Sequence, residues 1–332
     1  MQSNAEFSDS DSGSYPEKEN SSKFHFIISA PRSGSTWLAK ALNGHPDIYS
    51  TETRLFGEFC EIWPNADGSM TPRITFDEFL KQFSTHFMYE EMGLNQKQFT
   101  ERFQRGFISF LKNFRQRQTQ KEFIVDKITP YLGTTNLVLN RIDQYFPDSK
   151  AIQLIRDGRD VVTSGTFDWI LKDAQGTDRY SFFVEKRPGV TMRRFFDDKV
   201  LRRWVSLWRE PIEAYENVAA GLVIRYEGMK HNQGEVLSRV FEHLSCPFNS
   251  KILDGCIERA TFEKMSGRTV GDENAPLADA RKGISGDWKN YFTRKDGEFF
   301  DELAGQLLID LGYEKNRDWI LTLPNELAFV CE

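Results

Sequence analysis

Short apolar runs alternate with helical patterns along most of the chain. The run FHFIIS at 24–29 is rich in aromatic and β-branched residues, which predicts a buried strand. Pro31 and Gly34 interrupt this run, and a helix is predicted from 36 to 44. Three later apolar runs are each followed by a helical pattern, and they lie at 122–126, 150–155 and 221–227. Because strands that alternate with helices form parallel sheets covered on both faces, we predict an α/β fold.

The longer stretches between these runs have helical periodicity. Residues 52–120 are mostly helical in pattern, and one face carries apolar side chains spaced three or four residues apart. These side chains are Phe99, Phe103, Phe107, Leu111 and Phe114. Such a stripe is typical of a helix that packs on a core. A second helical region between 191 and 220 carries Trp204 and Trp208.

One ordered domain is expected after a disordered tail. Residues 1–22 are Ser-rich and acidic and contain no apolar run, whereas 24–325 contains no linker rich in Gly, Pro or Ser. We therefore predict a single domain over 23–332. The N-terminal segment fits neither a signal peptide nor a transit peptide. Because no run of about 20 apolar residues occurs, we predict no membrane span.

Charge and cysteine usage narrow the possible functions. The formal net charge of −6 argues against broad nucleic-acid binding, because domains with that function are usually basic. It still allows a local basic pocket for a small polyanion. The four cysteines, Cys60, Cys246, Cys256 and Cys331, have neither CxxC nor metal-ligand spacing, which predicts reduced thiols. We expect a cytoplasmic protein that holds no metal.

The segment that joins the first predicted strand to its helix has the composition of a phosphate-binding loop. Small residues leave backbone N–H groups free at a helix N-terminus, where the helix dipole also favours an anion. Arg32 adds a cation, and Gly34 permits a tight turn. Hydroxyl donors are supplied by Ser33, Ser35 and Thr36. An ordinary capped helix is the alternative interpretation. The usual ATP or GTP loop does not fit, because it requires Gly at Ser29 and Lys at Ser35.

PRSGSTW at 31–37 resembles the 5′-phosphosulfate loop of sulfotransferases that use 3′-phosphoadenosine 5′-phosphosulfate (PAPS). In that family the loop grips the 5′-phosphosulfate, and the tryptophan that often follows stacks near the adenine. The resemblance therefore implies that Trp37 lies beside the adenine. It also implies a parallel sheet flanked by helices, in a P-loop-like sulfotransferase fold.

Two further segments resemble the 3′-phosphate site of the same family. The segment 150–165 carries Arg156 and Ser164 in the family's R-(x)7-S pattern. The planar fork of an arginine suits a phosphate, although Arg156 would alternatively join a surface network with Asp157 or Asp160. ARKGISGDWKNYFT at 280–293 resembles the RKGxxGDWKNxFT segment of cytosolic members. There the segment closes over the 3′-phosphate, which implies that role for Arg281, Lys282 and Gly283.

Aromatic residues in two other segments resemble those that frame the adenine in this family. VIRYEGMK at 223–230 and ATFEKM at 260–265 are similar to its YEDMK and SFExM segments. The resemblance assigns this role to Tyr226 and Phe262, with ordinary core packing as the alternative for each.

Candidate groups for catalysis are two cations and two carboxylates. Arg32 and Lys127 would stabilise charge on the leaving phosphate. The cytosolic members use a His in a KTHLP segment, but DKITPYL at 126–132 contains none, so Asp126 is a candidate base. Glu52 is the first candidate, because HPDIYSTETRLF resembles the segment of protein-tyrosine sulfotransferases whose Glu acts as base. Either carboxylate would alternatively be a structural ion-pair partner. The five histidines are scattered, and none is predicted to be catalytic.

The resemblance implies a sulfotransferase that moves a sulfuryl group from PAPS to a hydroxyl or amine. The acceptor would be a small molecule, a glycan or a lipid, in a pocket walled by 55–115 and 167–195. A nucleotide kinase with a similar loop is one alternative. A non-catalytic nucleotide-binding protein that has lost its base is the other.

Overall fold

A five-stranded parallel sheet forms the centre of the computed structural model, in the order β2-β5-β1-β6-β7. The structure describes residues 22–52, 62–64, 70–72, 93–130, 132–176, 179–181, 193–215, 221–267, 269–270 and 282–328. The strands are β1 (Lys23–Ser29), β2 (Ile48–Thr51), β5 (Phe123–Ile128), β6 (Ala151–Ile155) and β7 (Leu222–Arg225). Four of them coincide with the predicted apolar runs, and the predicted α/β fold is confirmed. The predicted tail lies outside the described residues except for Ser22.

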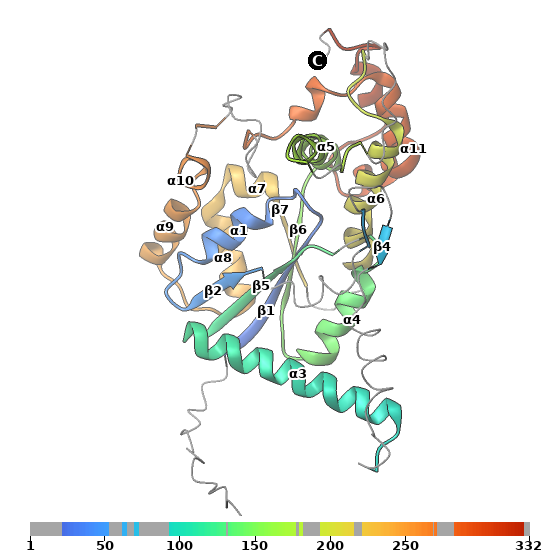
Figure 1. Cartoon of the computed structure of the whole chain (residues 1–332). Helices are drawn as coiled ribbons and strands as arrows, with labels where there is room; N and C mark the ends of the chain where they lie inside the picture. Colours follow the sequence, from blue (N-terminus) through green and yellow to red (C-terminus); the bar gives the residue numbers. More distant parts are fainter. Residues whose placement is uncertain are drawn as a thin grey trace, which may run out of the picture.

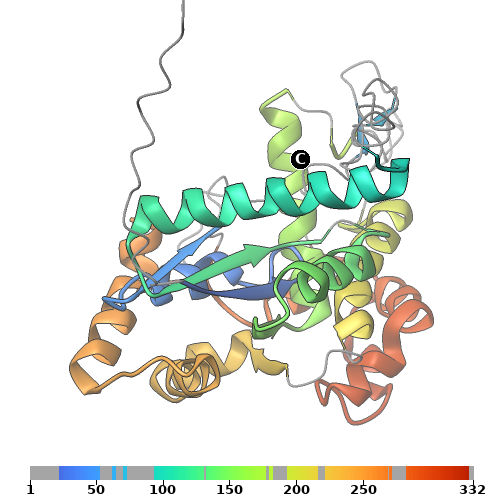
Figure 2. The same ribbon diagram turned by 90° about the horizontal axis from the view of Figure 1, so that it is seen from below.

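Helices cover both faces of this sheet (Figures 1 and 2). Apolar side chains alternate between the faces along each strand, so Ile27 and Phe26 enter different cores. The core of Ile27 is closed by α1 (Ser35–Leu42), α7 (Tyr226–His231), α8 (Gln233–Leu244) and α9 (Ser250–Arg259). The core of Phe26 is closed by α3 (Gln96–Thr119), α4 (Thr135–Tyr145) and the end of α6 (Asp198–Tyr215). A short helix, α10 (Phe262–Ser266), follows α9.

A third core lies beyond the carboxyl ends of the strands. It joins α5 (Gly158–Ala174) and α6 to η3 (Asp287–Asn290), α11 (Arg294–Asp310) and η4 (Asp318–Thr322). Arg159 is buried in this core, with its guanidinium 3.8 Å from the Trp288 ring centroid and 4.6 Å from that of Trp319. Its ion pairs with Asp157 (2.7 Å) and Glu314 (2.5 Å) neutralise the buried charge. These contacts attach the C-terminal segments to the start of α5.

The region predicted to be mostly helical differs from that prediction in two ways. It contains an antiparallel pair of short strands, β3 (Ile62–Pro64) and β4 (Met70–Pro72), besides α3. On α3 the buried face is centred on Ile108, and Gln104 bonds the Tyr145 hydroxyl at 2.6 Å. Within the predicted stripe Phe99 is buried and Phe103 is half-buried, but the prediction is wrong at Phe114, which is 52% exposed. The side chains of Phe107 and Leu111 lie outside the described part of the chain.

Candidate functional site

The loop between β1 and α1, residues 30–34, together with the first turn of α1, is called the first loop. Gly34 precedes α1 with φ 95°, a left-handed conformation that favours glycine. No described side chain caps this helix start. The hydroxyl of Ser33 is buried and has no hydrogen-bond partner among the described residues. An uncapped helix start beside an unpartnered buried hydroxyl fits an anion such as a phosphate.

Arg32 extends from this loop toward α5. Its Nε donates to the Ser164 hydroxyl at 3.2 Å, and one terminal nitrogen lies 3.5 Å from Asp168. Lys172 approaches the same carboxylate at 2.5 Å. The structure therefore joins two predicted site residues, Arg32 and Ser164. Sequence reasoning missed Asp168, whose only signal was its position one helical turn after Ser164.

Lys127 and Glu52 form an ion pair next to the first loop. Their nitrogen and oxygen are 2.7 Å apart, and Lys127 also donates to the Thr36 hydroxyl at 3.1 Å. The sheet register explains this meeting, because Thr51 pairs with Asp126 and the next residues along both strands are Glu52 and Lys127. The lysine is 9% exposed and the glutamate 41%, so the carboxylate lies at the open side of the site.

Asp126, the second candidate base, is not part of this cluster. It is buried, and strand alternation turns it to the face opposite Lys127. The flanking residues support this assignment, because Val125 packs in the core beside α1 and Ile128 in the core beside α4.

Arg156 bridges the first loop and a second one. The second loop, residues 282–288, is the first stretch of the described part of the segment 280–293, which resembles a 3′-phosphate site. One terminal nitrogen of Arg156 donates to the Arg32 carbonyl at 3.1 Å, and the other to the Ile284 carbonyl at 3.0 Å. Its Nε is buried without a partner among the described residues. The side chain is 11% exposed, so it does not belong to a surface network.

The second loop contains two of the predicted cofactor residues, Lys282 and Gly283, and they contact different parts of the protein. Lys282 is buried, with its Nζ 3.4 Å from Asp287 and 3.3 Å from the Tyr291 hydroxyl. Gly283 has φ 64° and contacts the ring of Phe262, which a Cβ at this position would approach to 2.5 Å. Lys230 donates to the carbonyl of Gly283. The third predicted residue of this segment, Arg281, lies outside the described residues.

Tyr226 packs between the predicted phosphate and adenine residues. Its ring lies under the Arg156 guanidinium at 4.3 Å and meets Trp37 edge-on at 5.5 Å. A Cβ at Gly34 would come within 2.5 Å of the same ring. The indole N–H of Trp37 donates to the Ala260 carbonyl at 2.6 Å. The predicted aromatic residues therefore contact the glycines of both loops.

Burial changes the acid–base properties of the groups around Arg156. It raises the pKa of Asp160, against the opposing effect of the Arg156 guanidinium. It also raises the pKa of Glu227, whose carboxylate accepts from the Asp157 backbone at 3.0 Å. Buried carboxylates thus lie near the cations of the site and accept hydrogen bonds from backbone N–H groups.

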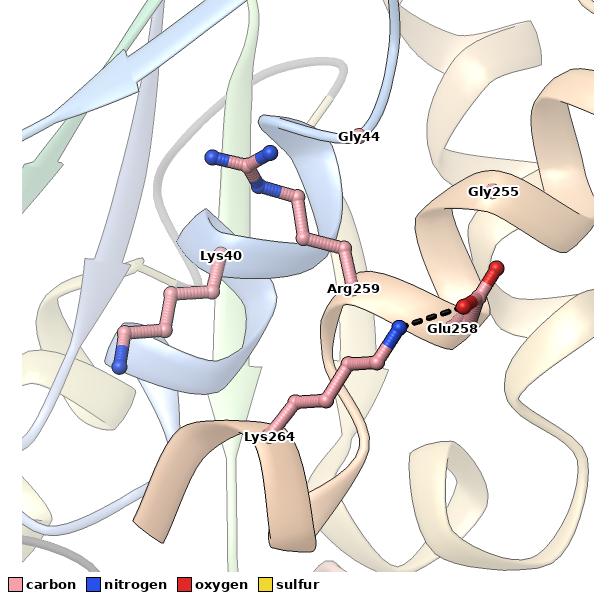
Figure 3. Close-up of a pocket in the computed structure, with 6 residues that line it drawn as sticks. All are labelled: Lys40, Gly44, Gly255, Glu258, Arg259 and Lys264. Carbon is pink, nitrogen blue, oxygen red and sulfur yellow. Dashed lines mark hydrogen bonds and ion pairs between the residues drawn. The ribbon is translucent and has the colours of Figure 1, made fainter. Parts of the chain in front are cut away.

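A separate hollow lies at the far end of α1 from the first loop. Its lining residues are Lys40, Gly44, Gly255, Glu258, Arg259 and Lys264 (Figure 3). Lys264 forms an ion pair with Glu258, while Lys40 and Arg259 extend in different directions. The C-terminal end of a helix carries the negative pole of its dipole, so this hollow lacks the advantage that the first loop offers to an anion.

The sequence also made predictions about metal sites, membrane spans and cysteines. Within the described ranges, no group of three or more His, Cys, Asp or Glu residues is placed to hold a metal ion. No described helix is long and apolar enough to cross a membrane. Cys246 and Cys256 are buried and free, and burial raises their pKa values to about 12 and about 11. Cys60 and Cys331 lie outside the described part of the chain.

Comparison with known proteins identifies related sequences and folds. A family model described as "Sulfotransferase domain" matches residues 23–312. Human sulfotransferase 2A1 is 27% identical over 201 residues, which cover 56% of this chain and 66% of that protein. Mouse sulfotransferase 2A2 is 28% identical over 195 residues, which cover 54% of this chain and 64% of that protein. These matches therefore span slightly less than two thirds of either relative. The crystal structure of mouse sulfotransferase SULT7A1 complexed with PAP is similar in fold, with TM-score 0.50 and 17% identity over 88% of this chain and 86% of that one.

Proposed function

Because the chain belongs to the sulfotransferase family, we propose that it transfers a sulfuryl group from PAPS to a hydroxyl or amine. The observation that carries the proposal is the arrangement of two loops around Arg156. The first loop contributes a helix start, a buried hydroxyl and two nearby cations. The second loop lies within hydrogen-bond reach of the same arginine. This spacing of positive groups suits a nucleotide with phosphates at both its 5′ and 3′ positions.

PAPS would supply the sulfuryl group, and the residues of this chain would bind and orient it. The amides and hydroxyls of the first loop would hold the 5′-phosphosulfate, and Arg156 with Ser164 would hold the 3′-phosphate. Tyr226, Trp37 and Phe262 would frame the adenine, since their rings lie against both loops. Positioning of this kind accounts for a large part of catalysis in group transfer.

Glu52 would accept the proton of the attacking hydroxyl or amine. The acceptor then forms a bond to sulfur while the bond from sulfur to the bridging phosphate oxygen breaks. Lys127 and Arg32 would stabilise the charge that develops on that oxygen. The ion pair between Glu52 and Lys127 supports these two roles, because the carboxylate and the ammonium are 2.7 Å apart beside the first loop. Asp126 is the weaker candidate, because it lies on the other face of the sheet.

The acceptor class remains part of the proposal: a small molecule, a glycan or a lipid precursor. The predicted walls, 55–115 and 167–195, lie partly outside the described residues. Among the described ones, Phe167 packs against Phe195 and Tyr291, with centroid distances of 4.7 and 5.0 Å. Phe167 lies on the same helix as Ser164, and its contacts with the other two rings would form an apolar boundary on that side.

Calorimetric titration with adenosine 3′,5′-bisphosphate (PAP) and with adenosine 5′-monophosphate (AMP) tests the nucleotide site. We expect PAP to bind much more tightly than AMP, because only PAP engages Arg156 and the second loop. Equal binding of the two nucleotides would refute the proposal. Turnover of PAPS with a panel of hydroxyl and amine acceptors then separates an enzyme from a non-catalytic binding protein, and ATP turnover would indicate a kinase.

A further inference from the structure

Asp160 lies next to the proposed 3′-phosphate site and contacts both Arg156 and the second loop. Its carboxylate accepts from the backbone N–H of Gly286 at 2.8 Å and from that of Trp288 at 3.1 Å. The same carboxylate lies 3.7 Å from a terminal nitrogen of Arg156. Its side chain is 1% exposed, so solvent does not provide these contacts. One carboxylate therefore connects Arg156, the residue directly after β6, to the second loop.

Burying a carboxylate is costly unless several donors satisfy it. Burying an unpaired charge destabilises the folded protein by several kcal/mol. A paired buried charge rarely stabilises it more than apolar packing would. Here Arg156 and the two amides meet this requirement, yet burial still raises the pKa of Asp160. Buried carboxylates whose pKa is shifted by burial and by a specific charged partner are common at functional sites. The burial of this carboxylate is therefore better explained by a role in the nucleotide site than by a contribution to core stability.

Arg156 alone does not fix the second loop. It contributes a single hydrogen bond, to the Ile284 carbonyl, and its other terminal nitrogen is used on the first loop. The amides two and four residues later are held by Asp160 instead. Without that carboxylate, the loop would lose two backbone hydrogen bonds to α5 and would keep the Arg156 bond and the stacking of Trp288 on Arg159, while the Arg156 guanidinium would lose the buried anion 3.7 Å away.

We propose that Asp160 is a positioning residue that holds the second loop and Arg156 in the arrangement that selects a 3′-phosphate. It acts through Arg156 and the backbone of the loop and does not itself touch the nucleotide. This inference rests on the proposed function and deepens it, because it explains how this chain would discriminate PAP from nucleotides without a 3′-phosphate.

The test compares PAP and AMP binding in the full chain carrying Asp160→Asn. The asparagine retains the volume but presents one N–H₂ group to donors, so it satisfies at most one of the two amides. We expect the affinity for PAP to fall about tenfold while that for AMP changes less than about twofold, as one charged contact is lost. In turnover, KM for PAPS should rise with kcat nearly unchanged.

Asp296→Asn is the matched control. Asp296 is also fully buried, accepts from the Thr293 backbone at 2.8 Å and pairs with Arg194 at 2.5 Å, but it belongs to the start of α11. It should lower the melting temperature without changing the ratio of PAP to AMP affinity. An unchanged ratio in Asp160→Asn would overturn the positioning role. If the unsubstituted protein fails to prefer PAP, the proposed function itself is wrong, which is a distinct result.

A measurement on the unsubstituted protein covers the case in which Asp160→Asn does not fold. The amides of Gly286 and Trp288 should exchange slowly with deuterium before any nucleotide is added, because Asp160 already accepts from both. Rapid exchange at both amides would overturn the proposal. Slow exchange that only PAP, and not AMP, slows further would support it.

Discussion

The two ends of the proposed nucleotide site hold their cations in different ways. Beside the second loop, Arg156 bonds to one backbone carbonyl of each loop and faces a buried carboxylate. At the first loop, Lys127 bonds only to side chains in the contacts described above, and its partner Glu52 is 41% exposed. Backbone partners cannot rotate away, whereas side-chain partners can exchange at small cost. The comparison suggests a rigid binding end and an adjustable end where chemistry would occur.

The largest expected effect comes from Glu52→Gln at the adjustable end. If Glu52 is the base, kcat should fall about 100-fold or more while PAP affinity stays within about twofold. Single-turnover kinetics with PAPS and calorimetry with PAP measure the two quantities. Asp126→Asn is the control at the neighbouring position. If kcat falls in Asp126→Asn but stays unchanged in Glu52→Gln, Asp126 is the base and Glu52 is not.

Arg156→Ala should cause the next largest effect and should act on binding. Removing a charged phosphate contact costs about 1.5–3 kcal/mol, so the KM for PAPS should rise at least about tenfold. Arg156→Lys retains the charge but has no fork to reach both loops, and we expect an intermediate KM. A normal KM in the alanine variant would contradict the assignment of the 3′-phosphate site.

Gly34→Ala tests whether the close contact with Tyr226 sets the first loop. The new Cβ would lie 2.5 Å from the ring, at a backbone φ of 95°. We expect a loss of about 1–3 kcal/mol in unfolding free energy, together with weaker PAP binding. Gly133→Ala is the control, since its φ is 86° but nothing lies within 4 Å of the added Cβ. Equal PAP affinity in the two variants would show that Tyr226 does not set the loop.

The smallest effect is expected from Lys264→Ala, in the hollow of Figure 3. Its ion pair with Glu258 is exposed, and such pairs contribute little to stability because solvent screens them. Thermal unfolding and PAP titration should both give values close to those of the unsubstituted protein. Weakened PAP binding would show that this hollow takes part in nucleotide recognition and would revise the boundary of the site.

The sequence predicted the sheet better than it predicted the contacts around it. Apolar runs of five to seven residues identified four strands, but β2 was missed because IYST offers only four residues with mixed character. Glu52 and Lys127 were each proposed from local segments, and the strand register then brought them together. Asp160 was considered only as a surface partner of Arg156. Its role depends on Gly286 and Trp288, which lie more than a hundred residues away and leave no local pattern.

The direction of a side chain was equally hard to predict from its segment. Lys282 stands between Arg281 and Gly283 in a loop rich in cations, yet it is turned toward Asp287 and Tyr291. On α3, Phe114 is exposed although it follows the spacing of Phe99, which is buried, and the polar Gln104 meets Tyr145 of α4. Periodicity reports which residues share a face of a helix, but the packing partner decides which face is covered.

The position of β2 at the end of the sheet has a consequence for sequence change. The turn before it, 43–47, sets how far the chain has advanced when it reaches Thr51 opposite Asp126. An inserted residue that the turn did not absorb would move every later side chain of the strand by about 3.3 Å and to the opposite face. Residue identity is constrained there as well, because a Cβ at Gly44 would come within 2.6 Å of the Cys256 backbone and Asn43 bonds both the carbonyl and the amide of Ser50. A library of protein variants built here should therefore keep the residue count, Asn43 and Gly44 fixed.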